Sequence, residues 1–271
     1  MDDEHVKGGS DGESAGDRPE DATVPSVARM YDYFLGGKDN YASDRAAAKK
    51  VLEALPTVEG VARANRAFLQ RAVRFVAGEG VDQFLDVGTG LPTQGNVHEV
   101  ARAVRPDAKV VYVDNDPMVV VHARALLATD AQTSIVQADM RSPGEILDAA
   151  RELLDFSRPV CLLFVAVLHF LPDAEDPAGK MRRLIDAVPP GSHVVLSHAA
   201  AEEQRNIRVG ETYRSQSASA PLVARTRDEV AALLDGLTVL DPGVVRLHEW
   251  RPAGGEYVTD AGWTAVARKD G

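Results

Sequence analysis

The sequence predicts an α/β fold, a doubly wound and mostly parallel sheet of seven strands with a helical cap at the N-terminus. Three observations support this prediction. An apolar run that begins at Phe84 ends in two glycines and leads into a helical segment, 97–104. Short apolar segments then alternate with helical ones, and about 50 residues of helical periodicity precede the glycines. Right-handed crossovers between parallel strands are the default for such an alternation.

Composition narrows the class of protein. Residues 1–24 contain eight acidic and two basic residues, a net −6 out of −11 for the chain, and we expect them to form a disordered acidic tail. The remainder has no basic stripe, so no nucleic acid is expected as a partner. No apolar run is long enough to span a bilayer, so no membrane is expected either. The one cysteine, Cys161, lies in an apolar run and is expected to be buried and reduced, which favours the cytoplasm.

Residues 25–78 are expected to form the helical cap. Ser26 follows a proline and is a good N-cap for a first helix that ends at Gly36. A second helix is expected at about 43–55 and a third at 58–76.

Residues 79–271 are expected to form the sheet domain. Strands are predicted at 84–87, 109–113, 134–138, 159–167, 191–197, 244–250 and 263–268, with helices at 97–104, 117–127, 177–188 and after 142 and 226. Asp116 is expected to cap the helix that follows it, and Ser142 and Thr226 each begin a capping-box pattern. The long polar stretch 199–220 is expected to cover the substrate.

The glycine turn reads Asp86-Val87-Gly88-Thr89-Gly90. A strand that ends in glycines and opens a helix brings bare backbone to a nucleotide-like ligand, and Asp86 stands at the carboxyl end of that strand. The dinucleotide fingerprint requires a small third residue where this chain has Thr93, which argues against NAD. A Gly-x-Gly alone is as readily a tight turn, so its meaning depends on context.

Acidic residues end the next two predicted strands. Asp114 stands where such folds hold both ribose hydroxyls; it could instead cap the next helix, but Asp116 already fits that role. Asp139 could receive an adenine amine or could be an ordinary turn aspartate. The neighbouring Asn115 and Met140 belong to the same expected site.

In this context the chain resembles the class I S-adenosylmethionine-dependent methyltransferases. The resemblance rests on 86–90, Asp114, 138–139 and 167–173, in the family's order. A narrower resemblance, to an actinobacterial S-adenosyl methyltransferase family formerly catalogued as a domain of unknown function, rests on 28–40, 155–160 and 242–245. It implies a Rossmann-like sheet of the class I methyltransferase type, S-adenosyl-L-methionine as the cofactor, and methyl transfer. Pro92 departs from the third glycine that is common in the broad class.

The expected cofactor site combines these residues with one aromatic ring. Its members are Asp86, Gly88, Gly90, Asp114, Asn115, Asp139, Met140 and Tyr33. Tyr33 lies off the apolar stripe of the first helix and could attract a sulfonium through its ring, whereas Tyr31 lies on that stripe and is expected to be core. No cluster of residues has the spacing of metal ligands, so no metal is expected.

No catalytic base can be named firmly. His169 and His198 follow the fourth and fifth strands and could each take a proton, or could each be structural. Methyl transfer requires no fixed triad, because alignment and exclusion of water can supply much of the acceleration. The hypothesis is therefore S-adenosylmethionine-dependent methyl transfer to a small-molecule acceptor. The alternatives are a non-catalytic protein that binds the same cofactor and an NAD-dependent oxidoreductase.

Overall fold

The computed structural model of the chain describes residues 23–92, 95–127, 130–201 and 221–271. Most of the expected tail at 1–24 and most of the expected cover at 199–220 lie outside these ranges, as does Thr93.

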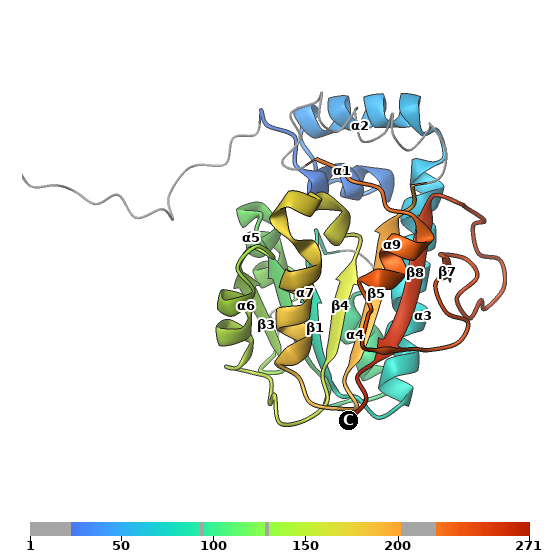
Figure 1. The fold of residues 1–271 in the computed structure, drawn as a ribbon. Coiled ribbons are helices and arrows are strands. Elements are labelled where there is room, and N and C mark those ends of the chain that lie inside the picture. The colour runs from blue at the N-terminus through green and yellow to red at the C-terminus, as the bar shows by residue number, and fades with distance from the viewer. Residues whose placement is uncertain (1–22, 93–94, 128–129, 202–220) are drawn as a thin grey trace, which may run out of the picture.

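A mixed sheet forms the centre of the molecule (Figure 1). Within the described residues its strands are β1 Gln83–Val87, β2 Lys109–Asp114, β3 Thr133–Gln137, β4 Cys161–Val165, β5 His193–Ala199, β6 Thr238–Val239, β7 Val245–Arg246 and β8 Gly262–Arg268. Their order is β3-β2-β1-β4-β5-β8-β6, with β7 also paired to β8. Strands β1 to β5 are parallel, and β8 runs antiparallel to its neighbours. The predicted doubly wound fold is confirmed, with the two-residue strand β6 in addition.

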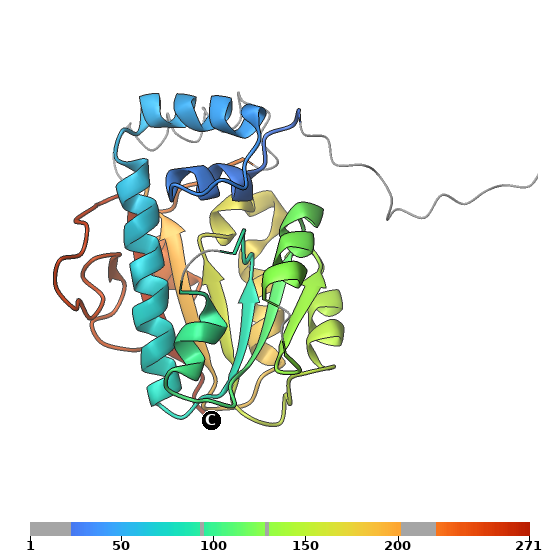
Figure 2. The same ribbon diagram turned by 180° about the vertical axis from the view of Figure 1, so that it is seen from behind.

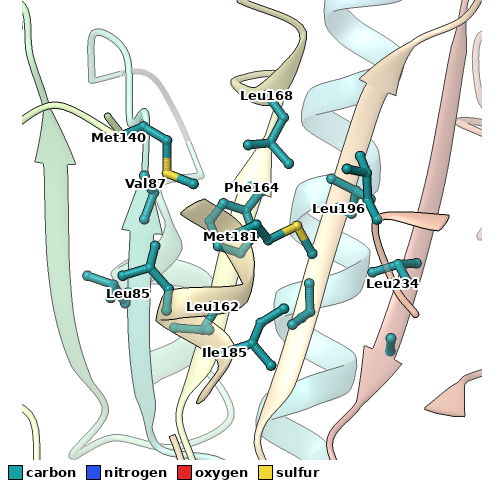
Figure 3. Close-up of a cluster of buried hydrophobic side chains, with 14 of the residues drawn as sticks. Leu85, Val87, Met140, Leu162, Phe164, Leu168, Met181, Ile185, Leu196 and Leu234 are labelled. Carbon is teal, nitrogen blue, oxygen red and sulfur yellow. The ribbon is translucent and has the colours of Figure 1, made fainter. Parts of the chain in front are cut away.

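Helices cover both faces of the sheet. Helices α3 Val58–Gly78, α4 Val97–Arg102 and α5 Pro117–Leu126 lie on one face (Figure 2), and α6 Pro143–Ala150, α7 Pro177–Asp186 and α9 Arg227–Ala232 lie on the other. Strand β1 is buried along its whole length, and its side chains alternate between the faces. Phe84 packs with the α3 side, whereas Leu85 and Val87 belong to the cluster drawn in Figure 3.

Helices α1 Val27–Phe34 and α2 Ala42–Ala54 form the cap, which lies above the arrowheads of the parallel strands (Figure 1). Met30 and Phe34 of α1 pack with Val51 of α2 in a separate apolar cluster. The third helix of the expected cap, α3, also packs on the sheet, because its Phe68 and Val73 belong to the apolar cluster between this helix and the strands. The cap is therefore joined to the sheet through one long helix.

Polar contacts also tie the cap to the sheet domain. Asp116 caps α5 as predicted, accepting from the Met118 N–H at 2.9 Å. Its second oxygen accepts from the Ser26 hydroxyl at 2.5 Å. Ser26 therefore occupies the expected N-cap position of α1, but its hydroxyl bridges to the sheet domain and makes no capping bond. Arg29 of α1 adds an ion pair to the same Asp116 at 3.8 Å, while its Nε donates to Asp44 of α2 at 2.8 Å and so joins the two cap helices.

Two local predictions are wrong. Ser142 precedes α6 but its side chain makes no capping bond, because its backbone (φ −115°, ψ 64°) differs from the extended geometry that Thr226 adopts in the capping box before α9. The expected strand 244–250 is reduced to Val245–Arg246. The chain turns there because Trp250 is fully buried against Phe68 and Phe75 of α3, with ring centroids 5.6 and 5.7 Å apart.

Candidate active site

A cavity of about 680 Å³ opens between the cap and the carboxyl ends of the parallel strands. This is the edge at which open α/β sheets bind ligands. Almost every residue expected in the site lines it: Asp86, Gly88, Gly90, Asp114, Asn115, Asp139, Met140, His169 and His198. Tyr33 is not part of the lining, and its ring instead packs edge-on against Phe34. Tyr31, which was expected to be core, packs with the cap cluster and also lines the cavity.

The glycine turn presents bare backbone to this cavity. Gly88 and Gly90 have φ values of 78° and 67°, which side chains rarely tolerate. A Cβ on Gly88 would lie 2.4 Å from Cγ2 of Val167, whereas one on Gly90 would meet no atom within 4 Å. The Gly88 N–H donates to the Val113 carbonyl at 2.8 Å and so fastens the turn to β2. Gly88 is required for packing, and Gly90 leaves open space beside the backbone.

Asp114 is held at the tip of β2 by backbone donors. Its oxygens accept from the Gly90 N–H at 2.8 Å and the Asp116 N–H at 3.0 Å. Burial raises the pKa of Asp114 to about 6, although the two hydrogen bonds act in the opposite direction and lower it. The carboxylate is thus oriented by the turn beside it and half-charged near pH 6.

Asp139 follows β3 and is paired differently. It accepts from Asn115 Nδ2 at 2.9 Å and from the Arg141 N–H at 2.8 Å. Burial raises its pKa, but these donors outweigh burial and leave the pKa below its ordinary value. Asn115 and Asp139 therefore form one polar edge of the cavity.

Asp86 is the most strongly perturbed acid of the cavity. It is 4% exposed, and burial raises its pKa to about 7; the Arg66 guanidinium lowers the pKa and Asp114 raises it. None of the described residues donates a hydrogen bond to its carboxyl group; Thr89 Oγ1 donates to its backbone carbonyl instead. A buried acid with this little compensation is suited to a cationic ligand group.

Arg66 of α3 is a site residue that the sequence did not reveal. Its Nη2 donates to Asn96 Oδ1 at 3.1 Å, while its buried Nε has no hydrogen-bond partner among the described residues. The guanidinium lines the cavity close enough to Asp86 to influence its pKa. Arg66 lies outside every motif, and helical periodicity alone does not distinguish it from the other arginines of α3.

The two candidate histidines are both neutral but differ in their contacts. His198 donates from Nδ1 to the Ala199 carbonyl at 2.9 Å, and its Nε2 accepts from Arg225 at 2.7 Å. Burial lowers its pKa to about 4, and Arg225 lowers it further. His169, in the short helix η1 Leu168–Phe170, accepts the Ala199 N–H at Nδ1, 3.2 Å away. The proton of this neutral ring is therefore on Nε2, and burial lowers its pKa well below the ordinary value.

A continuous series of hydrogen bonds, called the closed chain below because all its hydroxyl protons are used within it, links the cap to β5. The Ser197 hydroxyl accepts from the Ala166 N–H at 3.0 Å and donates to Asn65 Oδ1 at 2.6 Å. Asn65 Nδ2 donates to the Tyr31 hydroxyl at 3.1 Å, which donates in turn to the Ala62 carbonyl at 3.0 Å. Every hydroxyl proton of this chain is used internally.

Two features are absent from the parts of the chain that the structure describes. No group of three or more His, Cys, Asp and Glu side chains is placed to hold a metal ion. None of the helices combines the length and the apolar character that crossing a membrane requires.

Comparisons with known proteins agree with this geometry. The model of a family described as "S-adenosyl methyltransferase" matches residues 14–270. A DUF574 family protein from Streptomyces avermitilis MA-4680 is 39% identical, with a TM-score of 0.87 over 92% of this chain and 99% of that one. A candidate methyltransferase from Thermobifida fusca YX is 38% identical, with a TM-score of 0.87 over 93% and 97%.

More distant structures share the fold alone. The plantazolicin methyltransferase BamL, solved with a desmethylplantazolicin analogue and S-adenosylhomocysteine, is 11% identical, with a TM-score of 0.52 over 90% of this chain and 96% of that one. A comparison with curated proteins finds no match.

Proposed function

The chain belongs to the S-adenosyl methyltransferase family, and we propose that it transfers the methyl group of S-adenosyl-L-methionine to a small-molecule acceptor. The observation that carries this proposal is the convergence of three strand-tip acids, the bare glycine turn and the Arg66 side chain on one cavity. When bound, the cofactor supplies a sulfonium methyl group to a nucleophile.

The residues of the cavity fit the adenosine end of that cofactor. Asp114, oriented by two backbone N–H groups, can accept from the ribose hydroxyls. The edge formed by Asn115 and Asp139 offers both a donor and acceptors to the adenine, and Met140 beside it is buried and apolar. We assign these residues to the nucleoside.

The amino-acid end of the cofactor carries an ammonium group and a carboxylate. It therefore requires one anionic and one cationic side chain, and the cavity offers both. Asp86 can accept from the ammonium group, which would favour its ionised form. The guanidinium of Arg66, which lines the cavity, can donate to the carboxylate. Because the opposite charges of Asp86 and Arg66 already interact, we propose that they bind the opposite charges of an amino acid.

Calorimetry on the purified full-length protein tests this assignment with two ligands. S-adenosylhomocysteine carries the amino-acid end, whereas 5′-methylthioadenosine lacks it. Arg66→Met is expected to lower the affinity for S-adenosylhomocysteine about tenfold or more and to leave the affinity for 5′-methylthioadenosine unchanged. Only the first ligand loses a charge-assisted hydrogen bond. Arg63→Met, an exposed change on the same helix and outside the cavity, is the control.

Two results would contradict the proposal. A wild-type protein that binds neither ligand would refute the assignment of the cofactor. Equal losses for both ligands in Arg66→Met would remove Arg66 from the amino-acid subsite and indicate a general disturbance of the cavity.

A further inference from the structure

Beyond the cofactor residues, the cavity has a second wall that is predominantly apolar. It includes Val27, Phe34, Val58, Leu69, Phe170 and Leu222. The charged side chains of the described lining belong to the proposed cofactor site, to the Arg29–Asp116 ion pair at 3.8 Å or, in the case of Arg141, to ion pairs with Asp139 and Glu175. Among the described residues, a permanently charged acceptor on this wall would therefore find no unpaired counter-ion, and burying it there is costly.

The polar groups of this wall are almost all committed to one another. Tyr31, Asn65 and Ser197 form the closed chain, and both ring nitrogens of His198 are bonded. His169 differs. Its Nδ1 accepts from the Ala199 backbone, and its Nε2–H makes no hydrogen bond to another described residue. One directed donor thus remains on an apolar wall, and such isolated polar groups fix the orientation of a ligand.

We infer that the methyl acceptor is an uncharged, mostly apolar molecule with an aromatic hydroxyl or enol group, and that His169 positions its oxygen through a hydrogen bond from Nε2. This inference rests on the proposed methyl transfer and specifies the substrate class of the same cavity.

The choice of oxygen follows from counting lone pairs. An oxygen can accept from His169 and still attack with another lone pair. A neutral amine has one lone pair, and a hydrogen bond to it would occupy the electrons that must attack. The direction of the bond is fixed, since the Ala199 N–H requires an acceptor at Nδ1.

The choice of an acidic hydroxyl follows from the protonation state of the wall. His169 and His198 cannot readily accept a proton at neutral pH, because burial lowers the pKa of both rings. With Asp86 and Asp114 assigned to the cofactor, the acceptor would release its proton to water, which phenols and enols do far more readily than alkyl alcohols. The oxygen then forms a bond to the methyl carbon as the carbon–sulfur bond breaks, with that electron pair passing to sulfur.

Two substitutions separate the roles of the two ring nitrogens. His169→Asn keeps an acceptor near the position of Nδ1 for the Ala199 N–H and removes the outer donor. His169→Gln places an amide N–H near the position of Nε2. His122→Ala changes a histidine of α5 outside the cavity and is the control.

The probes are 2-naphthol and naphthalene, which differ by the hydroxyl group, titrated into the protein saturated with S-adenosylhomocysteine. Wild type and His169→Gln are expected to prefer 2-naphthol, and His169→Asn to lose about tenfold in affinity for 2-naphthol with naphthalene unchanged. With S-adenosylmethionine, mass spectrometry is expected to detect 2-methoxynaphthalene. Failure of S-adenosylhomocysteine to bind would count against the proposed function, not against this inference.

Given a saturated cofactor site, other outcomes overturn the inference. They are no binding of 2-naphthol, the same preference in His169→Asn as in wild type, or equal losses for both probes. A preference retained in His169→Asn but lost in His169→Gln would make His169 a purely structural partner of the backbone.

Discussion

Asp86→Asn is expected to stabilise the protein without ligand while weakening its cofactor binding. The carboxyl group is buried, and its pKa of about 7 lies above the ordinary 3.8. At about 1.4 kcal/mol for each tenfold change in proton affinity, this rise corresponds to about 4 kcal/mol of destabilisation when the group is ionised. Asparagine has nearly the same shape and no charge, so it avoids most of that cost.

The sign of the pH dependence follows from the raised pKa. Between about pH 4 and pH 7 the folded protein holds more protons than the unfolded chain, so stability falls as pH rises and the loss is complete above pH 7. The asparagine variant has no such loss at this site. Its advantage over wild type in free energy of unfolding should therefore be about 2–3 kcal/mol larger at pH 8 than at pH 5.

Urea denaturation at the two pH values measures this difference, and calorimetry measures the expected loss of about tenfold or more in affinity for S-adenosylhomocysteine. Asp148→Asn, which removes a carboxylate that is 81% exposed, is the control for pH effects and should change neither quantity. An advantage that is absent, or that does not grow from pH 5 to pH 8, would refute the argument that burial of Asp86 is uncompensated. Unchanged affinity would remove Asp86 from the cofactor site.

The remaining predictions concern the neighbouring strand tip and turn. Asp114→Ala should lower the affinity for S-adenosylhomocysteine about tenfold or more, since a pair of charge-assisted hydrogen bonds to the ribose is lost. In wild type that affinity should rise between pH 5 and pH 7, because bound hydroxyls favour the ionised form of a group whose pKa is about 6 in the free protein; a flat profile by calorimetry would argue against ribose binding there. Gly88→Ala should destabilise the protein by about 2 kcal/mol or more in thermal unfolding, through its positive φ and the contact with Val167. Gly78→Ala, in open space at the end of α3, should not destabilise it.

The sequence predicted which strand-tip acids line the cavity, because that part of the cavity is built from local patterns. Each acid lies at or just beyond the carboxyl end of a strand, and parallel strands place these ends at one edge, so Asp86, Asp114 and Asp139 had to converge once the fold was right. The same reasoning placed Asp116, since Asp-Pro is both a helix cap and a start signal.

Residues whose role depends on packing could not be found in this way. Arg66 is brought to the cavity by α3, and its position follows from how that helix lies on the sheet. Helical periodicity favoured Tyr33 over Tyr31 as the residue facing the cofactor. The cavity lies, however, on the side of α1 that carries the apolar stripe, so Tyr31 packs in the cap cluster and also lines the cavity. A stripe indicates burial without indicating whether protein or ligand covers it.

Helix α3 connects the two proposed halves of the cavity. Asn65 and Arg66 are adjacent, so their side chains leave the helix in different directions, one to the Ser197 chain and the other to the neighbourhood of Asp86. The same helix is anchored by Phe68, which is fully buried beneath the sheet. Because one rigid element carries both residues, the acceptor wall cannot shift along α3 without moving the cation proposed for the amino-acid end. The chain therefore fixes the separation of the two ligands through packing, as a reaction that depends on alignment requires.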